Sequence, residues 1–233
     1  MKPVCCLLGD GAVIGVNVGR RFAAEGYHAV LCRRSDQEGL DRLVSGIEAD
    51  GGVASGFLLN AIEEDAIEER IAQVEREIGP IQVVVFNLGA QIGDRSLYDT
   101  SYKAFELGWR MATFALFRTA QAVFPHMEDR GQGTLLVTSA TAAVRGNAGQ
   151  HSHAAAMGGR RMLCQSLNAQ FSPRGIHVAH IVIDGAVDAP DTLGKMLGAE
   201  RFQALRESKG MEHDGLMLPE KIADTYFHLA QQH

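Results

Sequence analysis

The chain has 233 residues, of which 46% are hydrophobic and 21% are charged, and its formal net charge is -6. These proportions match a globular protein and exclude a disordered chain, and the length suits one α/β domain. An acidic chain with no long basic run is a poor candidate for nucleic-acid binding. No apolar run reaches the roughly 18 residues of a membrane span, and the N-terminal run at 4–8 is too short for a signal peptide. We therefore expect neither a nucleic-acid nor a membrane partner.

Short β-branched runs alternate with longer amphipathic stretches along the chain. The runs predict strands at 3–8, 28–32, 53–58, 81–86, 134–138 and 177–183, and the stretches predict helices at 14–25, 36–49, 63–78, 101–127, 149–171 and 220–231. The strand runs are nearly continuous, which is typical of strands buried on both faces of a parallel sheet. We predict a single α/β domain over 1–233, a Rossmann-type doubly wound parallel sheet with helices on both faces. The weaker periodicity at 188–214 predicts a flap over the site.

A glycine-rich segment separates the first predicted strand from the first predicted helix. It contains Gly9, Gly11, Ile14 and Gly15. Glycines at this point let backbone N–H groups approach a pyrophosphate at the helix N-terminus. The spacing differs from G-x-G-x-x-G because Ile14 takes the place of the last glycine. We favour a dinucleotide-binding loop over the alternative, an ordinary strand–helix turn with a packing glycine.

Two arginines, Arg33 and Arg34, follow the second predicted strand. An acidic residue at the end of this strand would bond the ribose 2′-hydroxyl of NAD, whereas an arginine suits the 2′-phosphate of NADP. A guanidinium pairs bidentately with a phosphate. The sequence therefore favours NADP(H) over NAD(H), and the alternative is a pair of solvated arginines on a loop.

The cysteines and histidines indicate neither a disulfide nor a metal site. Cys5, Cys6, Cys32 and Cys164 form no C-x-x-C pair, and three of them lie in apolar, strand-like runs. This pattern predicts buried, reduced thiols and a cytoplasmic location. His151 and His153 are two residues apart, so they do not share a helical face, and no carboxylate accompanies them. We predict no bound metal.

Taken together, these segments resemble the short-chain dehydrogenase/reductase family along nearly the whole chain. The similarity covers the glycine loop with its helix (9–26), the stretch V-V-F-N-L-G-A at 84–90, the long helix at 109–127 and the strands at 133–139 and 175–185. The resemblance implies hydride transfer between the nicotinamide C4 and a carbonyl or alcohol carbon. It also implies cofactor contacts at Asn60, Asn87, Gly89, Asp184, Gly185 and Val187.

The catalytic positions that the resemblance implies depart from the family pattern. His153 stands in place of the tyrosine that acts as general acid/base, and Met157 in place of the lysine four residues later. The serine position falls on Ala140, with Ser139 beside it, and the asparagine position falls on Ala112. An unperturbed histidine titrates near about 6.5, so His153 can serve as the acid without a lysine. The alternative is a degenerate, silent site.

Three functions stay open on the sequence. The first is an NADP(H)-dependent short-chain oxidoreductase acting on a small carbonyl or alcohol, with His153 as the acid and Ser139 near the substrate oxygen. The second is a catalytically silent NADP(H)-binding pseudoenzyme or scaffold, and the third is a subunit without cofactor that pairs with an active homologue. The resemblance also implies a homodimer or homotetramer formed through the fourth and fifth helices, and a seventh strand that this sequence lacks. Arg160 and Arg161 are expected on a solvated or interfacial helix face.

Overall fold

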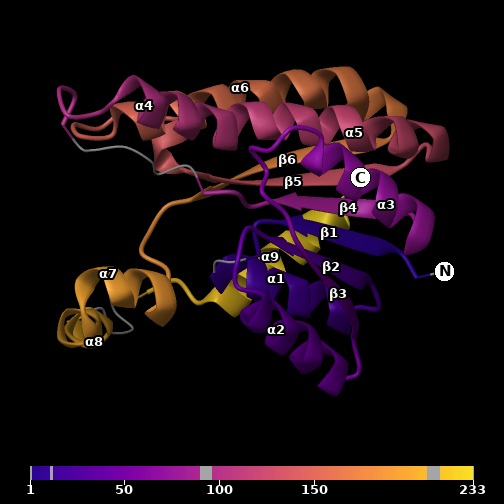
Figure 1. The fold of residues 1–233 in the computed structure, drawn as a ribbon, viewed down its shortest axis with the longest axis horizontal. Coiled ribbons are helices and arrows are strands. Elements are labelled where there is room, and N and C mark those ends of the chain that lie inside the picture. The colour runs from indigo at the N-terminus through magenta and orange to yellow at the C-terminus, as the bar shows by residue number, and fades with distance from the viewer. Residues whose placement is uncertain (1, 11–12, 90–95, 209–215, 233) are drawn as a thin grey trace.

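The computed structural model describes residues 2–10, 13–89, 96–208 and 216–232. Within these residues, one sheet of six parallel strands has the order β3-β2-β1-β4-β5-β6 (Figure 1). The strands are β1 Val4–Leu8, β2 His28–Arg33, β3 Val53–Leu58, β4 Ile81–Phe86, β5 Gly133–Ala140 and β6 Ile176–Ile183. This arrangement confirms the predicted Rossmann-type parallel sheet.

Helices cover both faces of the sheet. Figure 1 shows α4, α5 and α6 in a layer on one side and α1, α2 and α9 on the other. The bounds of the helices are α1 Val13–Ala24, α2 Gln37–Ala49, α3 Ala66–Glu77, α4 Tyr102–Trp109, α5 Ala115–Arg130, α6 His151–Phe171, α7 Lys195–Leu197, α8 Ala199–Ser208 and α9 Pro219–Ala230. The helices on both faces match the prediction.

Strand β1 shows why the strands are continuous apolar runs in the sequence. Val4, Cys6 and Leu8 pack on the side of α3 and α5, whereas Cys5 and Leu7 pack on the side of α1, α2 and α9. All five side chains are fully buried. Full burial of one aliphatic side chain stabilises a fold by about 1.5–3 kcal/mol, and here both faces contribute. All four cysteines are free and buried, as predicted.

The order of the strands changes direction at β1. β2 and β3 lie to one side of it, and β4, β5 and β6 lie to the other. In an open α/β sheet, such a point creates a crevice outside the carboxyl ends of the strands. The segments that follow β1, β2, β4, β5 and β6 therefore meet at one edge of the sheet. Most of the predicted cofactor residues lie on or beside these segments, whereas Asn60 follows β3 and His153 lies in α6.

The long helix predicted at 101–127 differs in the structure. The single helix predicted at 101–127 consists of α4, a π-helical segment Arg110–Phe114, and α5, which continues to Arg130. A π turn holds more residues than an α turn, and here it keeps the rings of Trp109 and Phe114 stacked, with centroids 5.8 Å apart. In the predicted flap, the described residues form a π segment, Pro190–Gly194, followed by α7 and α8. Residues 209–214 of that flap lie outside the described residues.

The described part of the chain contains no membrane span and no metal cluster. None of its helices is both long enough and apolar enough to cross a bilayer. No three His, Cys, Asp or Glu side chains in it gather as metal ligands.

An ion pair between Arg118 and Glu68 joins α5 to α3. Arg118 donates from Nε and Nη2 to Glu68 at 2.8 and 2.5 Å, and from Nη1 to the carbonyls of Ala61 and Glu63. The hydrogen bonds from Arg118 lower the pKa of Glu68. The pair therefore stabilises the fold above the ordinary pKa of a glutamate, and this contribution is lost as the pH falls through the lowered pKa.

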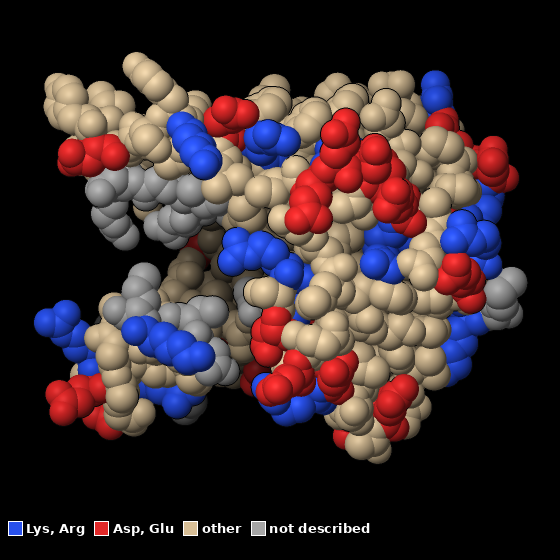
Figure 2. Space-filling view, viewed as in Figure 1, with Lys and Arg blue, Asp and Glu red and all other residues tan. Residues whose placement is uncertain are grey.

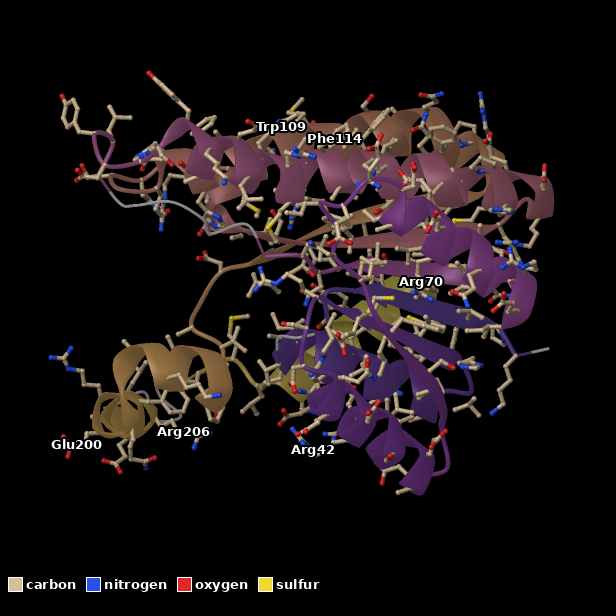
Figure 3. The ribbon with its side chains drawn as sticks, viewed as in Figure 1. Arg42, Arg70, Trp109, Phe114, Glu200 and Arg206 are labelled. Atoms are coloured by element: carbon tan, nitrogen blue, oxygen red, sulfur yellow. The ribbon has the colours of Figure 1, made fainter. Side chains whose placement is uncertain are left out.

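We expect Arg118→Ala to lower the free energy of unfolding at neutral pH by about 2–4 kcal/mol, because buried acceptors lose their donor. Urea denaturation followed by circular dichroism measures this loss, which should shrink at about pH 3. Arg42→Ala is the control, because Arg42 is exposed and lies 3.8 Å from Glu38 (Figure 3). It should cost less than about 0.5 kcal/mol. Equal losses in the two variants would contradict the role assigned to Arg118.

Candidate active site

The segment after β1 turns back against the ends of β2 and β4. The N–H groups of Gly9 and Asp10 donate to the carbonyl of Cys32 at 2.9 and 3.1 Å, and Asn87 Nδ2 donates to the carbonyl of Gly9 at 2.8 Å. Gly9 has a φ of +97°, and a Cβ there would lie 2.8 Å from backbone atoms of Asn87. A Cβ on Gly15, in the first turn of α1, would lie 2.6 Å from Asp10 Cα. The absence of a Cβ at Gly9 and Gly15 therefore lets the turn pack closely against neighbouring backbone.

The turn leads into the N-terminus of α1, which begins at Val13, one residue before the predicted start. The first N–H groups of a helix have no partner within the helix, and they attract anions. Ile14 packs its side chain against the core, so it does not cover these groups. Gly11 lies outside the described residues. Close backbone packing at Gly9 and Gly15 beside a helix N-terminus suits the pyrophosphate of a dinucleotide.

Arg33, at the end of β2, is already paired within the protein. Its Nε and Nη2 each donate to a carboxylate oxygen of Asp10 at 3.3 Å, and its Nη1 donates to Asp36 at 3.0 Å. Asp10 is fully buried, and burial outweighs the attraction of Arg33 and raises the pKa of this carboxyl. The neighbouring Arg34 is exposed. The segment after β2 therefore presents one guanidinium that is held in place and one that is solvated.

The other predicted cofactor residues follow β3, β4 and β6. Asn60, after β3, donates from its amide to Glu63 at 2.9 Å. Gly89, after β4, is exposed, and among the described residues outside its chain neighbours no atom lies within 4 Å of a Cβ built on it. Asp184 and Gly185, after β6, are also exposed, and a Cβ on Gly185 would lie 2.8 Å from the sulfur of Met217. Exposed backbone after β4 and β6 therefore lies at the sheet edge beside the paired amide of Asn60.

The segment after β6 crosses this edge and continues into α7 and α8. Val187 forms a parallel bridge with Met217, and Asp188 accepts hydrogen bonds from Arg206 of α8 at 3.0 and 2.6 Å (Figure 3). These contacts connect α8 to the end of β6. Figure 2 shows the surface hollowed between the α7–α8 segment and the layer that contains α4. The hollow faces the carboxyl ends of the strands.

His153 lies in the first turn of α6 and is half-buried. Its Nδ1 is inaccessible to solvent. Met157, one turn later, is 3% exposed, and the hydroxyl of Ser139 points at its sulfur from 3.8 Å. Ala112 is buried in the π segment, and Ala140 is half-buried at the end of β5. The structure therefore brings Ser139 to the helix face that carries His153 and Met157.

Arg160 is only 1% exposed, so the prediction of a solvated or interfacial position is wrong for this residue. Its guanidinium donates to the carbonyls of Leu88, Thr138 and Ala112 at 2.9, 2.6 and 3.0 Å. Arg160 is buried because it lies on the face of α6 that packs against the sheet. The carbonyls of Leu88, Thr138 and Ala112 would otherwise lack this hydrogen-bond donor there. The signal that could have located it is its spacing of three residues from Met157, which lies on the buried face of the same helix.

A family model described as short chain dehydrogenase matches residues 3–194. This span contains all of the strands β1 to β6. The chain belongs to the short-chain dehydrogenase/reductase family. Proteins similar in sequence to this chain are described as reductases and dehydrogenases. The family is therefore one of oxidoreductases.

Two relatives in this family resemble most of the chain. The short-chain reductase protein NovJ of Streptomyces niveus is 30% identical over 233 residues, which cover 99% of this chain and 87% of that protein. The 3-oxoacyl-(acyl-carrier-protein) reductase FabG of Thermotoga maritima is 28% identical over 189 residues, which cover 81% of this chain and 76% of that protein.

Solved structures share the fold. The short-chain dehydrogenase from Rhodopseudomonas palustris has a TM-score of 0.80 and 29% identity, over 99% of this chain and 92% of that chain. A metagenomic short-chain oxidoreductase solved in complex with NADP also has a TM-score of 0.80, with 20% identity, over 100% of this chain and 91% of that chain.

We expect Gly9→Ala to lower both the melting temperature and the affinity for NADPH, the latter at least about tenfold, because its Cβ would displace the backbone of Asn87. Gly26→Ala is a matched control, because Gly26 has a φ of +89° with no atom within 4 Å of an added Cβ. It should carry only the cost of a positive φ, about 1–2 kcal/mol. Thermal denaturation and fluorescence titration with NADPH measure the two effects. Unchanged NADPH affinity in a folded Gly9→Ala protein would mean that this turn does not form the binding surface.

Proposed function

We propose that the chain is an NADP(H)-dependent reductase of a small carbonyl compound, with His153 as the general acid. The observation that carries this proposal is the position of His153. It lies in the first turn of α6, on the helix face that Ser139 contacts through Met157. That face and the glycine turn lie at the same sheet edge. One substrate could therefore contact both His153 and a dinucleotide bound at the glycine turn.

Each part of the proposed site has a separate task. The backbone at Gly9 and Gly15 holds the pyrophosphate, and NADPH, when bound, supplies the hydride. His153 donates the proton on Nε2 to the substrate oxygen as that oxygen gains charge, a role that contributes about 10²–10⁴-fold to a rate. Without a substrate, the hydroxyl of Ser139 faces the sulfur of Met157, which is a weak hydrogen-bond acceptor. When a substrate binds, this hydroxyl donates instead to the substrate oxygen, which is a stronger acceptor.

NADPH is the proposed cofactor because of the charges after β2. Asp10 holds Arg33 through two of its nitrogens, so the guanidinium plane has one orientation. Arg33 is bound on its other side by Asp36, whose side chain is 60% exposed and can be displaced. Arg34 is exposed beside it. Two guanidinium groups at this position favour a 2′-phosphate, which NADH does not have.

A second copy of the chain is the proposed partner. Tyr102, Phe105, Trp109, Phe114 and Phe117 recur along α4, the π segment and α5, and each is at least 37% exposed. Figure 3 shows Trp109 and Phe114 together on this helical layer. An extended apolar surface of this kind marks a protein contact. Two copies related by a twofold axis would each cover the stripe of the other.

We expect His153→Ala to reduce kcat about 10²–10⁴-fold with little change in NADPH affinity, because the variant lacks only the acid. The assay follows NADPH oxidation with a panel of small aldehydes and ketones. His151→Ala is the control, because His151 lies in the same helical turn but its Nε2 is bonded to Thr100 at 3.0 Å. An unchanged rate in His153→Ala would exclude it as the acid. A wild-type chain that binds NADPH but reduces no carbonyl would instead be a silent binding protein.

We expect light scattering after gel filtration to give at least twice the 25.2 kDa mass of one chain. Phe117→Glu should give the monomer mass, because it places a charge within the apolar stripe. Leu218→Glu is the control, because Leu218 lies outside the stripe with the same 45% exposure as Phe117. A monomeric wild-type chain, or an unchanged mass for Phe117→Glu, would contradict the proposed dimer surface.

A further inference from the structure

Arg160 lies in the middle of α6 and directs its guanidinium toward the carboxyl edge of the sheet. Nε donates to the carbonyl of Ala112 in the π segment, Nη1 to that of Thr138 in β5, and Nη2 to that of Leu88 after β4. The ring of Phe86 lies 5.0 Å from its Cζ. One side chain therefore joins α6 to three separate backbone segments.

This buried charge has no carboxylate partner within the part of the chain that the structure describes. Its partners are the three carbonyl dipoles and the ring of Phe86. Burial lowers the pKa of Arg160 to about 10, so the guanidinium is still charged at neutral pH. A buried charge is costly unless hydrogen bonds offset its desolvation, and here three carbonyls do so. The cost of burying Arg160 is therefore offset only if these three backbone segments stay where they are.

Each carbonyl that Arg160 binds belongs to a segment of the candidate site. Leu88 directly follows Asn87, whose amide holds the glycine turn. Thr138 directly precedes Ser139 in β5. Ala112 occupies the centre of the π segment that packs against α6. The guanidinium therefore reaches the cofactor side and the acid side of the site at the same time.

Met157 and Arg160 are three residues apart on α6, so their side chains lie on adjacent turns of one face. Met157 is buried beside Ser139 and carries no charge. We propose that Arg160 is a positioning residue for the reaction: it fixes three backbone segments of the site and supplies, from beneath them, a positive charge that Met157 does not. This inference rests on the proposed function, and it adds a residue that does not touch the substrate.

The variant Arg160→Met leaves three buried carbonyls without their donor, so we expect the melting temperature to fall. The affinity for NADPH should fall at least about tenfold, because the backbone beside Asn87 is no longer fixed. Arg118→Ala is the matched destabilised variant, because its lost hydrogen bonds lie between α5 and α3, and it should keep the wild-type affinity for NADPH. Arg161→Met, at the half-buried neighbouring position, is the control and should match the wild type in both measurements. Wild-type NADPH affinity in a folded Arg160→Met protein would overturn the proposal, and so would an equal loss of affinity in folded Arg118→Ala.

The variant Arg160→Lys keeps a positive charge but lacks the planar fork that binds three carbonyls at once. With a carbonyl that the wild type reduces, we expect kcat to fall at least about tenfold while KM changes less than about threefold. Wild-type kcat in the folded Arg160→Lys protein would overturn the proposal. If the wild type binds NADPH but reduces no carbonyl, the proposed function fails, and the NADPH affinities of Arg160→Met and Arg161→Met still decide whether Arg160 positions the site.

Discussion

Parallel strands bring the loops that follow them to one edge of a sheet, where the last backbone groups of each strand must find partners with little help from water. In this chain those partners come from the protein. The carbonyl of Cys32 accepts from the turn after β1, and the carbonyl of Gly9 accepts from Asn87. The carbonyls of Leu88 and Thr138 accept from Arg160. This network sets where the backbone can lie, and the proposed site is the surface that it leaves open to a ligand.

The two ends of this edge hold buried charge in different ways. At the end of β2, the buried carboxylate of Asp10 holds two nitrogens of Arg33 and fixes the orientation of its guanidinium. At the other end, Arg160 is held by carbonyl dipoles, and its positive charge is not cancelled by a described carboxylate. In the proposed site, Met157 stands where the family resemblance implies a lysine, and Arg160 places a positive charge beneath the segments that form the site.

The strands were predictable because burial on both faces of a parallel sheet leaves a plain sequence signal. Which face of each helix is buried was less predictable. Phe117 and Phe124 look equivalent in the sequence, yet Phe117 is 45% exposed and Phe124 is 3% exposed. Phe124 packs against Phe171 at the end of α6, with ring centroids 4.8 Å apart, and periodicity along one helix does not reveal such a long-range contact. Arg160 was missed because arginine is read as a surface residue, although its spacing from Met157 and Cys164 places all three on one buried face.

Calorimetric titration of the full chain with NADPH and with NADH tests the central claim, that this edge is a dinucleotide site with a place for a 2′-phosphate. We predict saturable binding of one NADPH per chain and at least about tenfold weaker binding of NADH. A melting experiment provides a second readout, since a ligand at 100 times its Kd stabilises a fold by about 2.7 kcal/mol. Equal affinity for the two cofactors would contradict the assignment of Arg33 and Arg34. Absence of binding and of any melting shift with both would contradict the account of the site.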